Sequence, residues 1–378
     1  MKVIVLGAGL VGAPMAFDLA NDNEFDITVA DFSLASLNKF AKYSNIKTVQ
    51  LDVSNKDKLT SVISDFDFVL NAVPGFLGFE TIKTIIEANK NVVDISFFPE
   101  NPFELDKLAQ KHNVTVIVDC GVAPGMSNIL VGYLSSKLDK TENVEIYVGG
   151  LPEIRQLPYE YKAVFSPFDV IEEYTRPARY IENGKMVIKP ALSDIELMNF
   201  PNIGTLEAFN SDGLRSLAET IDAPNMKEKT LRYPGHVEKM KLLRETGFFN
   251  KDIIEINGLK ISPLDFTSKL LFPKWKLEEG EVDITVMKII VEGFKDNKKI
   301  FSSYYLYDKY NFDTKVHSMA RTTGYTATMV LRMISKGLFN HVGIIVPEMI
   351  GKNEACVNFI LSGLEQRGII YHKSVSYN

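Results

Sequence analysis

The segment KVIVLGAGLVG at residues 2–12 decides the fold. Its first five residues predict a buried strand, a helical spacing of apolar residues begins at Val11, and the glycines connect the two. In this context Gly7 makes a tight turn, Gly9 lets a pyrophosphate approach the backbone, and Gly12 lets the helix approach the strand. The alternative is a glycine turn without a ligand. We expect the loop to bind a dinucleotide through Gly7, Ala8, Gly9, Leu10, Val11 and Gly12.

An acidic residue, Asp31, ends the next predicted strand, 19 positions after Gly12. A carboxylate at this place accepts hydrogen bonds from the ribose hydroxyls of NAD, and it repels the additional 2′-phosphate of NADP. No arginine follows closely that would hold that phosphate. The sequence therefore predicts NAD as the cofactor.

Two further spots are candidates for cofactor contacts. Asp52 ends the third predicted strand, where it can accept a hydrogen bond from the adenine amino group; its alternative is the cap of the helix that begins near Asn55. Val73, Pro74 and Gly75 follow the fourth predicted strand, at the edge where ligands bind in open α/β sheets. Their alternative is an ordinary Pro-Gly turn.

Strands and helices alternate through the first third of the chain. After the first strand come strand candidates at 26–30, 46–51, 67–73, 91–96 and 114–119, each separated from the next by a helical pattern. Such an alternation is typical of a doubly wound parallel sheet. The sequence predicts an α/β protein with a Rossmann domain at residues 1–120.

The rest of the chain changes character twice. Residues 121–315 contain strand candidates at 143–151, 283–292 and 300–307, which predict a second, α+β domain for the substrate. Residues 316–378 contain amphipathic helical patterns at 318–336 and 348–368. We expect these C-terminal helices to return to the Rossmann domain.

Composition excludes several classes of protein. The 378 residues are 46% hydrophobic with a formal net charge of −6, and no block of like charge points to nucleic acid or a membrane surface. The two cysteines and five separated histidines do not form a metal-binding pattern. There is no apolar run long enough to span a membrane, and MKVIVLG does not read as a signal peptide. We expect a cytoplasmic protein without bound metal.

Several longer stretches carry a resemblance to a known family. They are VLGAGLVG (5–12), VDCGVAPGMSNIL (118–130), YVGGLP (147–152), LPYEYKAVFSPFDVIEEYTRPARYIENGK (157–185), GTLEAFNSDGLRSL (204–217), TLRYPGHVEKMKLL (230–243) and MARTTGYT (319–326). With these the chain resembles the lysine 6-dehydrogenases, within the wider saccharopine dehydrogenase superfamily. The resemblance implies NAD-dependent oxidation of the ε-amine of L-lysine to 2-aminoadipate 6-semialdehyde, which cyclises, with release of ammonia. It also implies a homodimer whose middle domain is catalytic and dimerising.

The chain departs from saccharopine reductases at three positions. Ala123, Phe97 and Val148 stand where those relatives carry an acidic residue, a tyrosine and a cysteine. The loss of these polar groups argues against a saccharopine substrate.

Oxidation of an amine requires removal of a proton, because the lysine ammonium has a pKa of about 10.4 in water. Asp119 ends the last predicted strand of the Rossmann domain and is one candidate for proton transfer or amine recognition; its alternative is a helix cap. His236 lies in the family-specific segment RYPGH and is a candidate base or water activator. A structural role is the alternative for His236.

Other residues are candidates for substrate binding. Arg232 lies on the same segment as His236 and suits a carboxylate. Glu207, Asp212 and Arg215 follow one another in LEAFNSDGLRS and suit the amino-acid end of a substrate, although Asp212 equally suits a helix cap. Tyr161 is expected to line the pocket, with aromatic packing as its alternative.

Three functions remain open from the sequence. The first is an NAD-dependent lysine 6-dehydrogenase acting on a free amino acid. The second is a reductase of the saccharopine or carboxynorspermidine type, whose substrate has a second carboxylate and needs an additional cation. The third is a non-catalytic NAD-binding sensor, against which the charged segments 204–217 and 230–244 argue.

Overall fold

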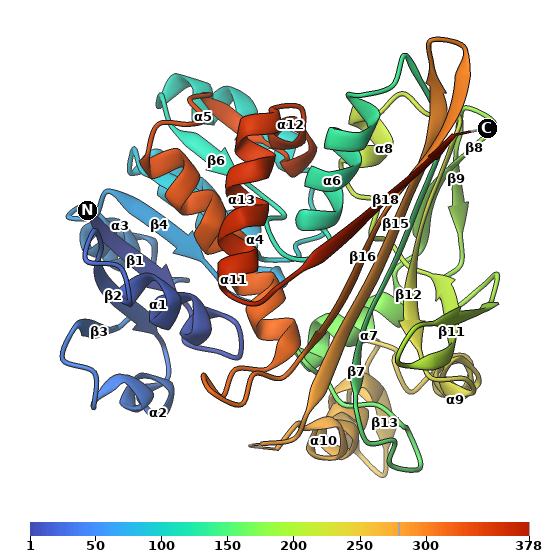
Figure 1. The fold of residues 1–378 in the computed structure, drawn as a ribbon. Coiled ribbons are helices and arrows are strands. Elements are labelled where there is room, and N and C mark those ends of the chain that lie inside the picture. Colours follow the sequence, from blue (N-terminus) through green and yellow to red (C-terminus); the bar gives the residue numbers. More distant parts are fainter. Residues whose placement is uncertain (279, 378) are drawn as a thin grey trace. The chain divides into compact units, whose positions relative to one another are not determined.

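A parallel sheet of seven strands lies at the centre of the first of two units in this computed structural model, which describes residues 1–278 and 280–377 (Figure 1). Unit 1 contains Met1–Ser136 and Ala320–Ile370. Unit 2 contains Lys137–Met319 and the residues from Tyr371 onward.

The sheet of unit 1 has the strand order β17-β6-β5-β4-β1-β2-β3 with parallel pairing throughout. The order reverses between β1 and β4, which is the place where ligands bind in doubly wound folds. The predicted fold class is confirmed. The strands are β1 (Lys2–Leu6), β2 (Asp26–Asp31), β3 (Ile46–Gln50), β4 (Phe68–Asn71), β5 (Asn91–Asp94), β6 (Thr115–Ile117) and β17 (Gly343–Ile345).

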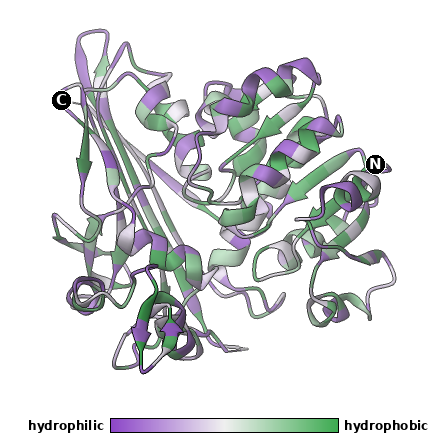
Figure 2. Cartoon of the chain, turned by 180° about the vertical axis from the view of Figure 1, so that it is seen from behind, coloured by the Kyte–Doolittle hydropathy of each residue, from purple (hydrophilic) through white to green (hydrophobic). Residues whose placement is uncertain are grey.

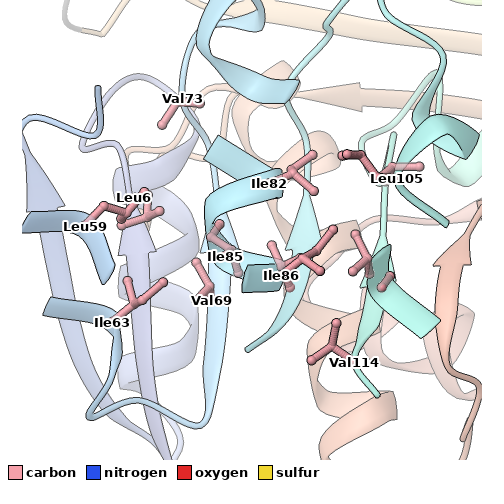
Figure 3. Close-up of a cluster of buried hydrophobic side chains, with 14 of the residues drawn as sticks. Leu6, Leu59, Ile63, Val69, Val73, Ile82, Ile85, Ile86, Leu105 and Val114 are labelled. Carbon is pink, nitrogen blue, oxygen red and sulfur yellow. The ribbon is translucent and has the colours of Figure 1, made fainter. Parts of the chain in front are cut away.

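Helices connect these strands and bury their apolar sides on the sheet. The cluster around α4 includes Ile82, Ile85 and Ile86, all fully buried, and Figure 3 shows these side chains between Leu6 and Val114. Figure 2 shows the strands of the parallel sheet coloured mainly hydrophobic, as expected for strands covered on both faces. The helices are α1 (Gly12–Ala20), α2 (Leu34–Leu37), η1 (Asn38–Phe40), α3 (Lys56–Ile63), α4 (Gly75–Glu87), η2 (Pro102–Leu105), α5 (Asp106–Lys111) and α6 (Met126–Ser135).

The C-terminal helices belong to unit 1, apart from the first two residues of α11. Asp18 of α1 binds α11 and the end of α13: its Oδ2 accepts hydrogen bonds from Arg332 Nη1 at 2.6 Å and Thr328 Oγ1 at 2.5 Å, and its Oδ1 accepts one from Arg367 Nε at 2.5 Å. A buried carboxylate with two guanidinium partners is well compensated. The elements are α11 (Ser318–Ser335), α12 (Pro347–Gly351) and α13 (Glu354–Gln366).

Unit 2 is built on a mixed sheet with the order β10-β11-β12-β7-β15-β16-β18, with β8 and β9 attached to β12. Its longest strands, β7, β15 and β16, lie side by side, and β15 and β16, which cover the strand candidates at 283–292 and 300–307, form a hairpin. The strands are β7 (Lys140–Pro152), β8 (Ala178–Glu182), β9 (Lys185–Lys189), β10 (Glu196–Phe200), β11 (Gly204–Asn210), β12 (Asn225–Arg232), β15 (Asp283–Lys295), β16 (Lys298–Lys309) and β18 (Tyr371–Tyr377).

The helices of unit 2 share an aromatic core. Trp275 and Tyr174 are fully buried in it, together with Phe209 of β11. The helices are α7 (Pro167–Thr175), α8 (Leu217–Thr220), α9 (His236–Thr246) and α10 (Pro263–Trp275), and a small hairpin is formed by β13 (Ile254–Ile256) and β14 (Leu259–Ile261).

The units divide the chain at other positions than the sequence suggested. The first boundary falls after Ser136 rather than after residue 120, because α6 is part of unit 1. The return to unit 1 begins at Ala320 rather than 316, and the last strand, β18, belongs to unit 2 because it pairs with β16. The sequence also missed β17, whose pairing partner β6 lies more than 200 residues earlier.

Among the described residues, no helix combines the length and apolar character needed to cross a bilayer. The same residues contain no cluster of three or more His, Cys, Asp or Glu side chains suited to a metal ion.

Candidate functional site

The glycine loop between β1 and α1 has the shape of a phosphate-binding turn. Gly7 has a φ of +103° and donates its N–H to Ala30 O at 2.8 Å. A Cβ at Gly12 would clash with the Gly7 carbonyl, whereas a Cβ at Gly9 would have no atom within 4 Å. The space beside Gly9 is therefore open to a pyrophosphate, and the residues of the loop fit a dinucleotide.

Asp31 is tied to this loop. Its Oδ2 accepts a hydrogen bond from the N–H of Ala8 at 2.6 Å, and its Oδ1 accepts one from Ser33 N at 2.7 Å. Leu10 is half exposed, and Val11 begins α1 without a side-chain cap. The carboxylate is thus fixed next to the start of α1, where ribose hydroxyls are bound in this kind of fold.

The other cofactor candidates lie at strand ends of unit 1. Asp52 is exposed, and its Oδ1 accepts hydrogen bonds from Ser54 N at 3.0 Å and Ser54 Oγ at 2.6 Å. Asn55, not Asp52, caps α3. These hydrogen bonds lower the pKa of Asp52, so this carboxylate stays ionised.

The segment Val73-Pro74-Gly75 joins β4 to α4. Val73 is buried in the core, Pro74 precedes the helix, and Gly75 is its first residue. The segment follows the carboxyl end of β4, next to the place where the strand order reverses. This position agrees with a cofactor contact, which stays a prediction.

Two buried carboxyl groups follow neighbouring strands at the carboxyl edge of the sheet in unit 1. Asp94 ends β5 and is fully buried, and Asp119 follows β6, is 3% exposed and has a φ of +52°. Asp94 Oδ1 accepts hydrogen bonds from Asn71 Nδ2 at 2.7 Å and Ser96 Oγ at 2.6 Å. Burial, together with the charge of Asp119, raises the pKa of Asp94 to about 7, against hydrogen bonds that lower it.

Asp94 is a residue that the sequence analysis missed. The available signal was an acidic residue at the end of a buried strand, NVVD, on the strand that precedes the one followed by Asp119. Because parallel strands end at one edge, acidic residues at two neighbouring strand ends predict a shared site.

In unit 2, Glu207 forms the cap of α9. Its Oε1 accepts a hydrogen bond from Val237 N at 2.6 Å, and its Oε2 accepts one from Gly235 N at 2.9 Å. A carboxylate at a helix N-terminus is stabilised by the unpaired N–H groups and the helix dipole. Both oxygens of Glu207 therefore serve the backbone in this structure.

His236, the first residue of α9, is 1% exposed, and both of its ring nitrogens have partners. Nδ1 lies 3.1 Å from Tyr159 O, and Nε2 lies 2.9 Å from Tyr174 Oη. Since a carbonyl only accepts, Nδ1 carries the proton and Nε2 accepts from the tyrosine. Burial and the nearby Arg232 lower the pKa of His236 to about 3. The imidazole is neutral and engaged, which favours a positioning role over that of a base.

Arg232 is buried with the aromatic residues around His236. Its Nη2 donates to Glu173 Oε2 at 2.6 Å, and its guanidinium lies 4.6 Å from the centre of the Tyr161 ring. Tyr161 also contacts Trp275 edge to face. The structure brings Arg232, Tyr161 and His236 together, with the guanidinium already paired to a carboxylate.

Asp212 and Arg215 lie in a second polar group of unit 2. Asp212 binds Arg179 through both oxygens, Nε to Oδ1 at 2.9 Å and Nη2 to Oδ2 at 3.0 Å. Arg215 is 4% exposed with a φ of +52°. The pKa of Arg176 is lowered by the burial of Arg176 itself and by the charge of Arg215. Asp212 therefore does not form the helix cap that was its alternative, because both of its oxygens bind Arg179.

Glu228, which was not singled out in the sequence, lies beside this group. It is 3% exposed and accepts hydrogen bonds from Ser211 Oγ at 2.7 Å and Gly213 N at 3.1 Å. Burial raises the pKa of Glu228 to about 8.

Comparisons with known proteins agree with this arrangement. The family model described as saccharopine dehydrogenase NADP binding domain matches residues 3–117, and the one described as saccharopine dehydrogenase C-terminal domain matches residues 121–369. The structure of apo saccharopine dehydrogenase (L-Glu forming) from Saccharomyces cerevisiae superposes with a TM-score of 0.82 at 21% identity, covering 99% of both chains.

Curated relatives share less than a third of their residues with this chain. Mitochondrial alpha-aminoadipic semialdehyde synthase of Bos taurus is 29% identical over 286 residues, which cover 71% of this chain and 31% of that protein. Saccharopine dehydrogenase (NADP(+), L-glutamate-forming) of Saccharomyces cerevisiae is 27% identical and covers 80% of this chain and 71% of that protein. Carboxyaminopropylagmatine dehydrogenase of a Synechocystis strain is 24% identical over 99% of this chain and 98% of that protein.

The aligned part spans about a third of the length of the bovine and mouse synthases. The family models together cover both units from residue 3 to residue 369, which is well over half of the sequence. The chain belongs to the saccharopine dehydrogenase family and contains the nucleotide-binding and C-terminal domains of that family.

Proposed function

We propose that the chain is an NAD-dependent dehydrogenase that oxidises the C–N bond of a side-chain amine, with the ε-amine of L-lysine as its substrate. The observation that carries the proposal is the buried Asp119 at the carboxyl edge of the nucleotide-binding sheet, next to Asp94. The segments that resemble lysine 6-dehydrogenases support the choice of lysine.

In this proposal some residues of unit 1 bind the cofactor and another transfers the proton. When bound, NAD supplies the hydride acceptor. The glycine loop holds the pyrophosphate, and Asp31 accepts the ribose hydroxyls while it stays tied to Ala8 N. Asp119 accepts a proton from the substrate ammonium, which must become a neutral amine before its carbon can lose a hydride.

The preference for NAD rests on Asp31. Its carboxylate repels a 2′-phosphate, so we expect tighter binding of NAD than of NADP, measured by calorimetry. Asp31→Ser removes this repulsion and is expected to narrow the ratio of the two dissociation constants. Equal affinity of the unaltered protein for both nucleotides would contradict the preference.

A second candidate is a saccharopine-type activity, which joins or splits an amino acid and an aldehyde through a secondary amine. The observation that favours it is the arginine group of unit 2, where Arg179 pairs with Asp212, Arg176 pairs with Glu172, and the charge of Arg215 acts on Arg176. Three guanidinium groups near two carboxylates suit a substrate with additional carboxylates. Relatives named for saccharopine and carboxyaminopropylagmatine add weight to this candidate.

The deciding experiment follows NADH absorbance after purified protein and NAD are mixed with L-lysine, ornithine, saccharopine or carboxynorspermidine in parallel. Turnover with lysine alone supports the proposal. Turnover with saccharopine or carboxynorspermidine, but not with lysine, moves the chain to the second candidate. NAD binding without turnover of any amine would instead support a non-catalytic sensor.

We also propose that the protein is a homodimer, as the resemblance implies. Light scattering coupled to size-exclusion chromatography is expected to give twice the chain mass of 42.5 kDa. A mass of one chain at micromolar concentration would contradict it.

A further inference from the structure

An exposed phenylalanine follows β2 beside the glycine loop. Phe32 comes directly after Asp31 and is 72% exposed. Leu10 in the glycine loop and Leu34 at the start of α2 are exposed as well. Single exposed apolar residues are common, but these three follow the carboxyl ends of two paired strands, β1 and β2. The sheet edge that is expected to bind a dinucleotide therefore presents apolar side chains to solvent, which is typical of a binding surface.

The backbone around Phe32 is held by hydrogen bonds to both neighbouring strand ends. The carbonyl of Phe32 accepts one from Gln50 Nε2, at the end of β3, at 3.0 Å. The preceding residue, Asp31, accepts one from Leu51 N at its carbonyl, at 3.0 Å, and one from Ala8 N at its carboxylate. The ends of β1, β2 and β3 are thereby tied together. A ring that is fixed at its backbone loses little conformational freedom when a ligand covers it.

The strand order places Phe32 on one defined side of the glycine loop. The neighbours of β1 are β4 on one side and β2 on the other. In a doubly wound fold the pyrophosphate lies at the loop after β1, and the two nucleosides extend along the sheet edge in opposite directions. Asp31, which is expected to bind the adenosine ribose, ends β2, and Asp52, a candidate for the adenine amino group, follows β3. Phe32 is therefore on the adenosine side.

The side chain of Phe32 suits a nucleobase, because aromatic rings stack on the faces of bases. It does not suit a phosphate, which is bound by cations and N–H groups. A second exposed phenylalanine lies on the other side of β1: Phe76 follows β4 as the second residue of α4 and is 75% exposed. The two residues thus follow the two strands that flank β1. Of the two, only Phe32 is on the side expected for the adenine.

We propose that Phe32 is the residue on which the adenine ring of the dinucleotide stacks. The inference rests on the proposed function, since it takes the bound nucleotide to be NAD. Phe32 strengthens the binding of any nucleotide that contains adenine, in the oxidised and in the reduced form alike. The choice between NAD and NADP depends on Asp31, so Phe32→Ala should leave the ratio of these two dissociation constants unchanged.

The first test measures dissociation constants by calorimetry for NAD, ADP-ribose and nicotinamide mononucleotide. Phe32→Ala should raise those of NAD and ADP-ribose by roughly 5- to 150-fold, the usual effect of losing a ring that stacks on a base. The mononucleotide lacks adenine, and its constant should not change. Phe32→Tyr keeps the ring and should bind NAD as the unaltered protein does. Phe76→Ala should leave ADP-ribose binding unchanged, and Phe312→Ala, at a position 70% exposed in unit 2, should change none of the three constants.

The second test observes the contact itself. Phe32→Trp places an indole at the exposed position, whereas the single tryptophan of the chain, Trp275, is fully buried in unit 2. Stacking of adenine on the exposed indole is expected to quench its fluorescence when ADP-ribose is added. Nicotinamide mononucleotide should leave this fluorescence unchanged, and the emission of Trp275 in the unaltered protein should respond to neither compound.

Unchanged affinity of Phe32→Ala for ADP-ribose, or an equal loss in Phe32→Ala and Phe76→Ala, would overturn the inference. A lower mass in light scattering with unchanged nucleotide affinity would also overturn it and make Phe32 a contact between chains. Failure of all four amines as substrates would overturn the proposed function alone, because the dissociation constants decide the inference without turnover. The thermal midpoint checks that the variants fold, and the exposed position of Phe32 favours this.

Discussion

The two units bury polar side chains in opposite ways. Around α9 of unit 2, Arg232 binds Glu173 and the carboxylate of Glu207 binds two backbone N–H groups. At the carboxyl edge of unit 1, the donors to Asp94 are neutral, and the neighbouring Asp119 carries a charge of the same sign. Asp94 is therefore the group whose protonation state is expected to change near neutral pH, whereas the paired charges of unit 2 keep theirs. Proton transfer is therefore expected in unit 1.

The largest effect on activity is expected when the carboxyl group of Asp119 in unit 1 is replaced by a neutral amide. Asp119→Asn is expected to lower kcat by about 10²–10⁴-fold, the usual effect of losing a proton-transfer group. Steady-state kinetics with the substrate found in the NADH assay measures the loss. NAD affinity and the thermal midpoint serve as controls, and a loss below tenfold in a folded variant would remove Asp119 from proton transfer.

Unit 1 also contains a paired charge, Asp18. Its replacement tests whether burial of an ion pair, and not pairing alone, determines the loss of stability. Asp18→Ala leaves the buried Arg332 and the half-buried Arg367 without their shared carboxylate and should reduce the free energy of unfolding by roughly 3–5 kcal/mol. Urea unfolding followed by circular dichroism measures this change. Glu80→Gln, at an exposed pair, should cost less than about 1 kcal/mol. Similar losses in the two variants would contradict the role of burial.

The pH dependence of stability should have opposite signs for the two regions. The pKa of Asp94 is raised to about 7, so its contribution to stability is complete below the unfolded value of 3.8 and is lost as the pH rises to about 7. The pKa of His236 is lowered to about 3, so its contribution is complete above 6.5 and is lost as the pH falls toward 3. A difference of one pH unit between the pKa values in the folded and unfolded states corresponds to about 1.4 kcal/mol of stability.

Urea unfolding at a series of pH values checks these slopes. Trp275, the single tryptophan, lies in unit 2 near His236, so its fluorescence reports that unit. Asp94→Asn should flatten the slope between pH 4 and 7 in circular dichroism and leave the acid loss of the tryptophan signal in place. An unchanged slope would show that Asp94 is ionised in the folded state throughout.

The smallest effect is expected at Glu207. Glu207→Gln keeps one acceptor for α9 but turns an NH₂ group toward the second backbone N–H and removes the charge at the helix start. A cost of about 1–2 kcal/mol is expected from such caps, measured by urea unfolding with tryptophan fluorescence. A strong loss of kcat without loss of stability would instead make Glu207 a substrate ligand.

The features that could be predicted from the sequence are those that depend on residues close together in the chain. The glycine loop, Asp31 and the alternation of strands and helices depend on neighbouring residues, and the fold class followed from them. The pairing of Glu207 with the N-terminus of α9 and that of His236 with Tyr174 join residues 30 and 62 positions apart. Periodicity and spacing contain no information about such contacts, so these residues could be nominated but their roles could not be assigned.

The strand β17 has a consequence for how the protein is made. It pairs with β6, yet about 225 residues separate the two strands in the chain, and all of unit 2 up to Met319 is synthesised between them. During translation the edge of β6 therefore stays without its partner until residue 345 leaves the ribosome. An unpaired edge is a site of aggregation. We expect synthesis in cells to depend on a chaperone that covers this edge, and fragments that end near residue 136 to be poorly soluble.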